Sequence, residues 1–225
     1  MMNFEVEDEI KSLGVQVIFM IVRNIDNNYY GPQLKNLYKD YYQSLLKSDS
    51  YEKVTMHQHL VGYRGLHDKI DLNNPNLVAS PESIFKMLFK KGKLANINSL
   101  VDTYNYISVM DRISIGAHDM NKIVGDVTLK LTNGSERFVP LGSELAEAVS
   151  VGEYCYFDSS GEVICRLDCK QCDKTKITKK TNSCLIVLQG NNNVTLNSLL
   201  SSAKQLSSLL SEYNKGDIDY SIYIR

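Results

Sequence analysis

The longest apolar run of the chain places the strongest constraint on its fold. It extends from Val15 to Val22 and contains one polar residue, Gln16. The run is much shorter than the roughly 20 residues that a helix needs to cross a bilayer, so we predict no membrane span. A continuous series of Val, Ile, Phe and Met is typical of a strand that is covered on both faces. The sequence therefore predicts a central strand within Gly14–Ile25.

Helical periodicity follows in several segments. Apolar residues recur at three- and four-residue spacing over residues 34–46 and again over residues 196–210, which places them on one face of a helix. Asn191 to Asn193 are predicted to cap the second of these helices. A shorter helix is predicted from an N-cap at Ser80, a first-turn Pro81 and a terminating Gly92. A fourth helix is predicted to start near Asn98.

Alternating apolar residues predict antiparallel strands in the middle of the chain. Residues 127–131 and 138–141 flank Asn133-Gly134 and predict one hairpin, and residues 154–156 and 163–167 predict another around residues 158–161. Cys184–Leu188 is predicted to form a further strand, and Tyr220–Ile224 an edge strand. Because helices and hairpins come in separate blocks, we predict a single α+β domain over residues 1–225.

Charge and cysteine content limit the classes of function. The 225 residues carry 25 basic and 26 acidic side chains, a net charge of -1, which excludes binding to nucleic acid by bulk charge alone. We expect no DNA partner, and any affinity for RNA must be local. Five cysteines indicate reduced thiols rather than disulfides, and acidic residues rather than an export signal follow the first methionine. We therefore expect a cytoplasmic location.

One segment is locally cationic. Between Arg166 and Lys180 the chain carries six basic residues against two acidic ones. Lysines supply contacts to a phosphate backbone and hydroxyls add positioning hydrogen bonds, so this loop suits RNA. The predicted RNA contacts are Arg166, Lys170, Lys174, Thr175, Lys176 and Lys179; the alternative is a solvated face. A second cluster at Lys86, Lys90, Lys91 and Lys93 lies where the dipole of a helix alone favours cations.

Metal and catalytic motifs are weak in this sequence. Cys165, Cys169 and Cys172 are close enough in sequence to share a zinc ion, but a matching pair of ligands is missing and free thiols are the favoured interpretation. His57 and His59 have the spacing of a solvated edge strand. Neither a nucleophile elbow nor a phosphate-binding loop is present, which counts against those hydrolase and nucleotide-binding classes. We predict no cofactor and no bound metal.

Several motifs together resemble a known family. They are Ser80-Pro81-Glu82-Ser83, Ile97 to Asn105, Gly116-Ala117-His118-Asp119, Lys122 to Asp126, Cys165-Arg166 and Asp173 to Thr181. Their order is similar to that in the B3/B4 domain of the β subunit of bacterial phenylalanyl-tRNA synthetase, and in particular to the stand-alone version of that domain. The resemblance covers residues 62–213, which we expect to be the core. Residues 1–61 are expected to pack on it, and residues 214–225 to add the edge strand.

The resemblance implies an α+β fold, a link to tRNA and a pocket. In the synthetase, this pocket hydrolyses tyrosine that is mischarged onto phenylalanine tRNA. The residues that match the pocket here are Asn98, Asp102, Tyr104, Asn105, Gly116, Asp119 and Gln189. Four of the family's site residues are replaced. Tyr104 stands for a threonine, Gly116 for a histidine, His118 for a phenylalanine and Gln189 for a glutamate.

These replacements leave the activity open. A glutamine cannot accept a proton as a carboxylate does, so the editing machinery of the synthetase is absent. His118, expected on an irregular turn, is the one catalytic candidate, and a hydrogen-bonded structural histidine is the alternative. The leading hypothesis is a stand-alone protein that binds tRNA or a related RNA. A hydrolase that deacylates mischarged tRNA and a module that binds an amino acid or other small molecule are the alternatives; the sequence fixes neither the tRNA nor the oligomeric state.

Overall fold

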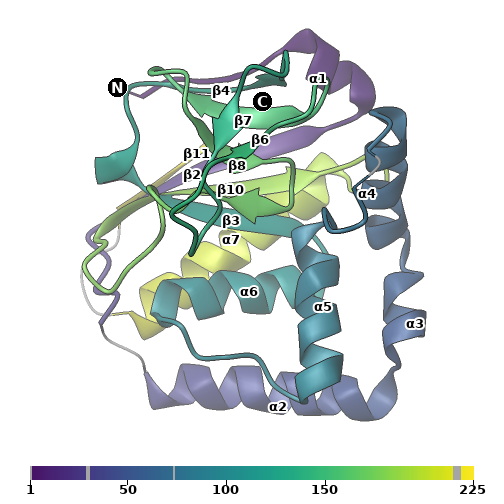
Figure 1. Ribbon diagram of the computed structural model, residues 1–225. Helices are drawn as coiled ribbons and strands as arrows, with labels where there is room; N and C mark the ends of the chain where they lie inside the picture. The colour runs from purple at the N-terminus through teal and green to yellow at the C-terminus, as the bar shows by residue number, and fades with distance from the viewer. Residues whose placement is uncertain (1, 29–30, 73, 215–218) are drawn as a thin grey trace.

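The computed structural model describes residues 2–28, 31–72, 74–214 and 219–225 and has a mixed α+β architecture (Figure 1). The helices are α1 (Asp8–Leu13), α2 (Pro32–Ser48), α3 (Tyr51–Thr55), α4 (Gln58–Lys69), α5 (Ser80–Lys91), α6 (Ser99–Asp111) and α7 (Leu196–Tyr213). The strands are β1 (Phe4–Val6), β2 (Gln16–Arg23), β3 (Ser114–Asp119), β4 (Val127–Leu131), β5 (Arg137–Phe138), β6 (Glu147–Ala148), β7 (Tyr154–Asp158), β8 (Val163–Arg166), β9 (Lys170–Gln171), β10 (Ser183–Gly190) and β11 (Asp219–Ile224). The α+β class predicted from the sequence is confirmed.

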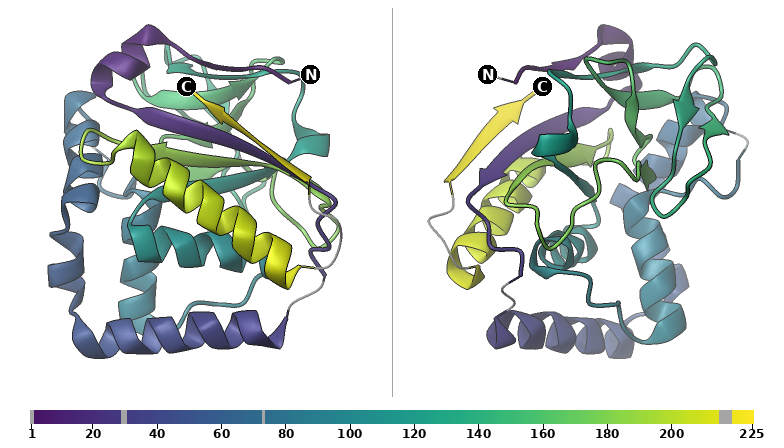
Figure 2. Two further views of the ribbon diagram at one scale, coloured as in Figure 1. Left: turned by 180° about the vertical axis from the view of Figure 1, so that it is seen from behind. Right: turned by 60° about the vertical axis from the view of Figure 1, so that its left-hand side comes forward.

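Two main sheets carry the fold. One has the strand order β11-β2-β10-β3 and is antiparallel throughout, and the other has the order β1-β4-β7-β8-β9. As predicted, β2 lies inside its sheet and β11 lies at the edge. Helix α7 runs alongside the four-stranded sheet, and α2 forms the base of the molecule (Figure 2).

The apolar run of β2 is explained by two separate cores. Ile18, Met20 and Val22 point into a cluster formed with the helices, whereas Phe19 and Ile21 point into a second cluster against the five-stranded sheet. Because successive side chains of a strand point to opposite faces, a strand between two cores must be apolar at every position. The apolar run of β2 is therefore explained by the position of this strand between the two cores.

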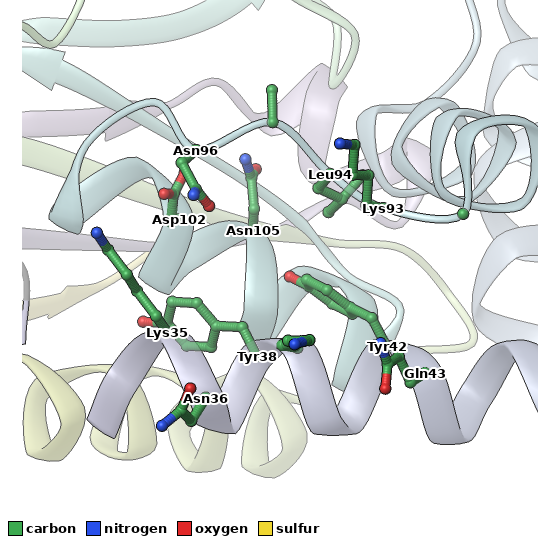
Figure 3. A pocket seen from close by; sticks show the side chains of 13 residues that line it. Lys35, Asn36, Tyr38, Tyr42, Gln43, Lys93, Leu94, Asn96, Asp102 and Asn105 are labelled. Carbon is green, nitrogen blue, oxygen red and sulfur yellow. The ribbon is translucent and has the colours of Figure 1, made fainter. Parts of the chain in front are cut away.

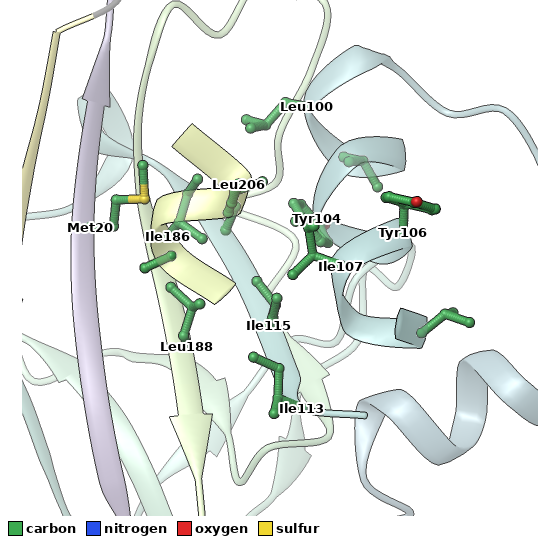
Figure 4. Close-up of a cluster of buried hydrophobic side chains, with 14 of the residues drawn as sticks. Met20, Leu100, Tyr104, Tyr106, Ile107, Ile113, Ile115, Ile186, Leu188 and Leu206 are labelled. Atoms are coloured by element: carbon green, nitrogen blue, oxygen red, sulfur yellow. The ribbon is translucent and has the colours of Figure 1, made fainter. Parts of the chain in front are cut away.

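The helical core closes the other side of this layer. Figure 4 shows Met20, Ile186 and Leu188 of the strands facing Ile107 of α6 and Leu206 of α7. All five side chains are fully buried. Burying a side chain of this size stabilises the fold by roughly 1.5–3 kcal/mol, so this contact fixes α6 firmly against the sheet. Helix α6 in turn carries residues that line the pocket described below.

One of the two predicted hairpins does not form. Residues 127–131 form β4, but β4 pairs with β7 and β1, and residues 137–138 pair with β6 instead. The chain leaves β4 through Thr132, which donates its N–H to the carbonyl of Glu153 and receives a bond from the N–H of Glu153 at its hydroxyl. These long-range bonds override the local Asn133-Gly134 turn signal. The second predicted hairpin, β7 with β8, is confirmed.

Two predicted caps shift by a few residues. Ala79, not Ser80, occupies the cap position of α5, and Thr195, not Asn191 to Asn193, caps α7 by accepting a hydrogen bond from the N–H of Ser198. Asn191 caps the preceding turn, where its side chain accepts from the N–H of Asn193. The Asn98 cap of α6 and the Gly92 end of α5 are confirmed, with Gly92 in the left-handed conformation that favours glycine.

The prediction of an edge strand at the histidine pair is wrong. His57 is the N-cap of α4, where its ring accepts a hydrogen bond from the N–H of His59. The helix forms because Leu60, Tyr63 and Leu66 fall on one buried face at helical spacing. Across the described residues, the structure contains no helix that has both the length and the apolar character needed to span a membrane.

Candidate ligand pocket

A pocket of about 360 Å³ lies between the two main sheets, at the edge formed by β3. Strands β3 and β10 supply one wall, β7 and β8 supply another, and α5 and α6 close the sides. Apolar side chains make up much of the lining; they include Ile84, Met87, Ile115, Leu141, Leu167 and Val187. A concave apolar site with a few polar groups is the usual form of a small-ligand site.

Strand β3 contributes Ser114, Ile115, Gly116 and His118 to the lining of this pocket. Ser114, Gly116 and His118 lie on one face of β3, and Gly116 and Ser114 pair with Val187 and Gln189 of β10. A Cβ atom built on Gly116 meets no heavy atom of the described residues within 4 Å. The missing side chain of Gly116 thus adds open space to the pocket.

Gln189 carries the most informative polar group of the pocket. The residue is 2% exposed, and its Oε1 accepts a hydrogen bond of 2.6 Å from the Tyr156 hydroxyl. Its Nε2 atom has no hydrogen-bond partner among the described residues. A buried donor without a partner costs roughly 1–3 kcal/mol, and a ligand oxygen that accepts from Nε2 removes that cost. This amide is therefore arranged to receive an acceptor atom.

The backbone near Gln189 is held by a second tyrosine. The Tyr63 hydroxyl donates to the carbonyl oxygen of Gln189 and accepts a hydrogen bond of 2.7 Å from the N–H of Ser114. Tyr63 is fully buried, and burial raises the pKa of its hydroxyl above the ordinary range of tyrosine. Tyr63 thus stays neutral and ties β3 and β10 together at the pocket. Neither tyrosine stands out in the sequence as a site residue, because their spacing shows only helix and strand patterns.

His118 also lines the pocket, but it lies in β3 and not on the irregular turn that the sequence predicted. The residue is 1% exposed, and its Nδ1 lies 2.7 Å from the Thr175 hydroxyl. Burial lowers the pKa of His118 to about 4, so the ring is neutral at pH 7. A neutral imidazole in a pocket wall accepts or donates a hydrogen bond without bringing in charge.

The predicted pocket residues divide into two groups. Tyr104 and Asn105 of α6, together with Gly116 and Gln189, line the pocket. The other three predicted residues order the walls instead. Asn98 caps α6 through the N–H of Val101, Asp102 accepts from the N–H of Ile97, and Asp119 accepts from Thr181 and from the N–H of Asn121.

A second hollow adjoins this pocket. It measures about 350 Å³ and lies between α2 and residues 92–96, and Asn105 lines both hollows (Figure 3). Figure 3 shows Tyr38 and Tyr42 of α2 below and Asn96, Asp102 and Asn105 above. The Tyr38 hydroxyl donates to the Thr103 hydroxyl at 2.7 Å, so this ring is fixed in the wall. Lysines 35, 39 and 93 give the rim a basic character.

Comparison with known proteins identifies the family. The B3/4 domain matches residues 70–222, about two thirds of the chain. The chain belongs to the B3/4 domain family. Among solved structures it is similar to an N-terminal fragment of the phenylalanyl-tRNA synthetase β-subunit from Pyrococcus horikoshii, with a TM-score of 0.52 and 15% identity over 96% of this chain and 50% of that chain. This likeness concerns the fold, and the chain spans half the length of that fragment. Comparison with curated proteins gives no match.

In this B3/4 domain, Arg166 is not available to RNA. Its side chain is 5% exposed and forms a two-pronged ion pair with Glu153, with Nε to Oε2 at 2.5 Å and Nη2 to Oε1 at 2.7 Å. Its third contact is to Glu147 at 2.8 Å. The hydrogen bonds with Glu153 raise the pKa of Arg166 further, so the guanidinium stays charged. The predicted contact between Arg166 and RNA is corrected here, because the guanidinium is buried and already paired.

The rest of the cationic loop is also largely paired. The Thr175 hydroxyl is fully buried against His118 and Cys172, so it holds the loop in place and cannot reach RNA. Lys170 pairs with Glu147, Lys174 with Glu162 and Lys176 with Asp173. Glu147 and Glu162 lie outside the loop, so the sequence pattern of the loop could not show these two pairs, whereas Asp173 belongs to the loop itself. Contacts of RNA with these lysines, and with the exposed Lys179, stay predictions.

Cys165, Cys169 and Cys172, the three cysteines considered as a zinc motif, do not come together as a cluster. Cys172 is buried and lies 3.1 Å from the Thr175 hydroxyl, and the Cys165 thiol donates to the carbonyl oxygen of Leu167. Cys169 lies beside Asp168 and His67 instead. Within the described residues, His67, Asp168 and Cys169 form the one group of His, Cys, Asp and Glu side chains whose ligand atoms lie near enough to share an ion. No sequence pattern pointed to it, because His67 lies about 100 residues away from its partners.

Proposed function

We propose that this B3/4 domain binds the aminoacylated 3′ end of a tRNA and holds the amino-acid side chain in the pocket between its sheets. The single observation that carries the proposal is the buried, unpartnered Nε2 of Gln189 in the wall of a pocket that is lined largely by apolar side chains. An aminoacyl ester offers an apolar or aromatic side chain together with a carbonyl oxygen. The carbonyl accepts from Nε2, and the side chain fills the space beside Gly116.

A basic surface next to the pocket supports the RNA part of the proposal. Ser83, Met87 and Lys90 lie at helical spacing on one face of α5, and Lys86 is three residues after Ser83. Ser83 and Met87 line the pocket, whereas Lys86 and Lys90 are exposed and form no ion pair among the described residues. Phosphates that follow the ester out of the pocket therefore pass lysines on α5 that form no ion pair within the described part of the chain. Three lysines of the loop that follows Arg166, in contrast, are already paired with acidic side chains.

The test measures the affinity of the protein for a panel of aminoacyl-tRNAs and for the same tRNAs without the amino acid, at several salt concentrations. We expect tighter binding of at least one charged tRNA. Gln189→Glu keeps the acceptor for Tyr156 but removes the donor, so it should reduce that preference about tenfold. Equal affinity for charged and uncharged tRNA across the panel contradicts the proposal.

The RNA surface has its own pair of variants. Lys86→Ala with Lys90→Ala should lower the slope of log affinity against log salt by about two, because two phosphate contacts are lost. Lys174→Ala with Lys176→Ala is the matched control, since both lysines already pair with acidic side chains. If both double variants lose the same amount of slope, then Lys174 and Lys176 also contact the RNA, as the sequence predicted for this loop.

Hydrolysis of the bound ester is the second candidate function. It is favoured by His118, a neutral imidazole in the pocket wall whose Nδ1 is held by Thr175. In this scheme the free ring nitrogen orients a water towards the ester carbonyl. The panel of charged tRNAs is incubated with the protein, and His118→Gln should restore the uncatalysed half-life of any ester that the protein shortens. Unchanged half-lives across the panel leave binding as the function, and stabilisation by free amino acids without any effect of tRNA would indicate a small-molecule module.

A further inference from the structure

Three side chains with different ligand atoms converge at one wall of the pocket. His67 comes from the end of α4, and Asp168 and Cys169 come from the turn between β8 and β9. His67 Nε2 lies 2.8 Å from Asp168 Oδ1, Cys169 Sγ lies 3.2 Å from the same oxygen, and Nε2 and Sγ are 3.9 Å apart. The three atoms therefore form a compact triangle.

The size of this triangle matches one face of a zinc tetrahedron. Zinc bonds of about 2.0–2.1 Å to nitrogen and oxygen and about 2.3 Å to sulfur separate neighbouring ligand atoms by about 3.3–3.6 Å. The observed separations lie within about half an ångström of these values. Imidazole, carboxylate and thiolate are all ligands that zinc accepts, and the mixture of nitrogen and sulfur disfavours calcium and magnesium.

The surroundings hold the triangle in place. The Tyr154 hydroxyl donates to the other carboxylate oxygen of Asp168 at 3.1 Å, which orients Oδ1 towards His67 and Cys169. The backbone carbonyl of Asp168 accepts from the N–H of Ser80 and from the Ser114 hydroxyl. Leu167, directly before these two ligands, takes a left-handed conformation with a φ of 55°. Such outer contacts are the usual support of metal ligands.

A cysteine nucleophile does not fit this arrangement. In a Cys-His-Asp triad, one ring nitrogen faces the thiol and the other faces the carboxylate. Here a single nitrogen, Nε2 of His67, faces both. Burial and the charge of Asp168 also raise the pKa of the Cys169 thiol. A bound dication reverses that condition, because it deprotonates a coordinating thiol.

We propose that His67, Asp168 and Cys169 bind one Zn²⁺ ion in the pocket wall, with its fourth position open to the pocket that Asp168 and Cys169 also line. The site stands independently of RNA binding, since its ligands and geometry involve neither Gln189 nor the lysines of α5. Its fourth ligand is a water or an oxygen or nitrogen atom of the molecule in the pocket. Three protein ligands with one open position is the form of zinc sites that bind substrates.

The test loads the full chain with Zn²⁺ and measures bound metal after extensive dialysis, together with a Co²⁺ titration followed by absorption. We expect one zinc per chain with a dissociation constant below micromolar. Cobalt should give visible ligand-field bands with the intensity of a four-coordinate ion and a near-ultraviolet band from thiolate to cobalt. Neither readout requires RNA, so failure of this site is distinct from failure of the proposed function.

Matched variants locate the site. Cys169→Ser should abolish the thiolate band and weaken zinc binding at least tenfold, and His67→Gln should weaken it similarly. Cys165→Ser is the control, because Cys165 lines the same pocket but lies outside the triangle. A stoichiometry near zero in the wild-type protein, a dissociation constant above micromolar, or a thiolate band that persists in Cys169→Ser and disappears in Cys165→Ser would overturn the proposal.

Discussion

The Tyr156 hydroxyl fixes the side-chain amide of Gln189 through a hydrogen bond of 2.6 Å, and both groups are buried. In this orientation Oε1 accepts from the hydroxyl, and Nε2 has no partner among the described residues. Tyr156 belongs to the five-stranded sheet and Gln189 to the four-stranded one. The bond therefore joins the two sheets at the pocket.

Tyr156→Phe should destabilise the fold and loosen this amide. The change removes one buried hydrogen bond and leaves Gln189 Oε1 without its donor, so the free energy of unfolding should fall by about 1–3 kcal/mol. Urea unfolding measures the loss. Tyr220→Phe is the control, since that side chain is exposed, and it should stay within about 0.5 kcal/mol of the wild type. A wild-type stability for Tyr156→Phe would show that water replaces the hydroxyl.

Substitutions at Gly116 should affect ligand affinity without destabilising the fold. Gly116→Ala should keep or raise the free energy of unfolding by up to about 1 kcal/mol, because glycine weakens a strand interior and the added Cβ meets open space. Gly116→Val should fold as well but fill the pocket and reduce ligand affinity. Thermal unfolding with and without charged tRNA measures both effects. Loss of folding in the alanine variant would show that this space is needed by the fold itself.

Removing Arg166 should cost much more stability than removing a lysine from an exposed ion pair. Arg166→Ala leaves the carboxylate of Glu153 buried and unpaired, so we expect a loss of about 3–5 kcal/mol in the free energy of unfolding. Lys176→Ala, which breaks an exposed pair with Asp173, should cost about 0–1 kcal/mol. Denaturant titrations of the two variants give the comparison. Equal stabilities would mean that Arg166 is solvated and return it to the set of candidate RNA contacts.

The sequence predicts those parts of the fold whose cause is local. The apolar run of β2 and the helical stripe of α2 each reflect burial on faces that repeat along the chain, and both elements form where expected. The strand after the Asn133-Gly134 turn does not, because bonds between Thr132 and Glu153 decide the partner of β4. A turn signal says that the chain reverses but not which strand it then meets.

The same limit applies to the site. The resemblance to the family led to Gly116, His118 and Gln189, and all three line the pocket. Charge counting along the chain placed Arg166 in an exposed cationic loop, because the acidic residues that neutralise it lie 13 and 19 positions away and meet it only in the fold. The charge of a segment in sequence is therefore a poor guide to the charge that it presents to a ligand.

His118 should make the fold sensitive to mild acid. Its pKa is about 4 in the folded protein against an ordinary value of 6.5, so the unfolded chain binds the extra proton first. The contribution to stability is complete above pH 6.5 and declines as the pH falls towards 4, and about 2 kcal/mol should be lost between pH 7.5 and pH 5. Urea unfolding at the two pH values measures this loss. The chain has three other histidines, so the quantity to compare is the difference between the wild type and His118→Asn, which lacks a titrating ring. The same pH dependence in both proteins would show that His118 is hydrated or takes up its proton without cost.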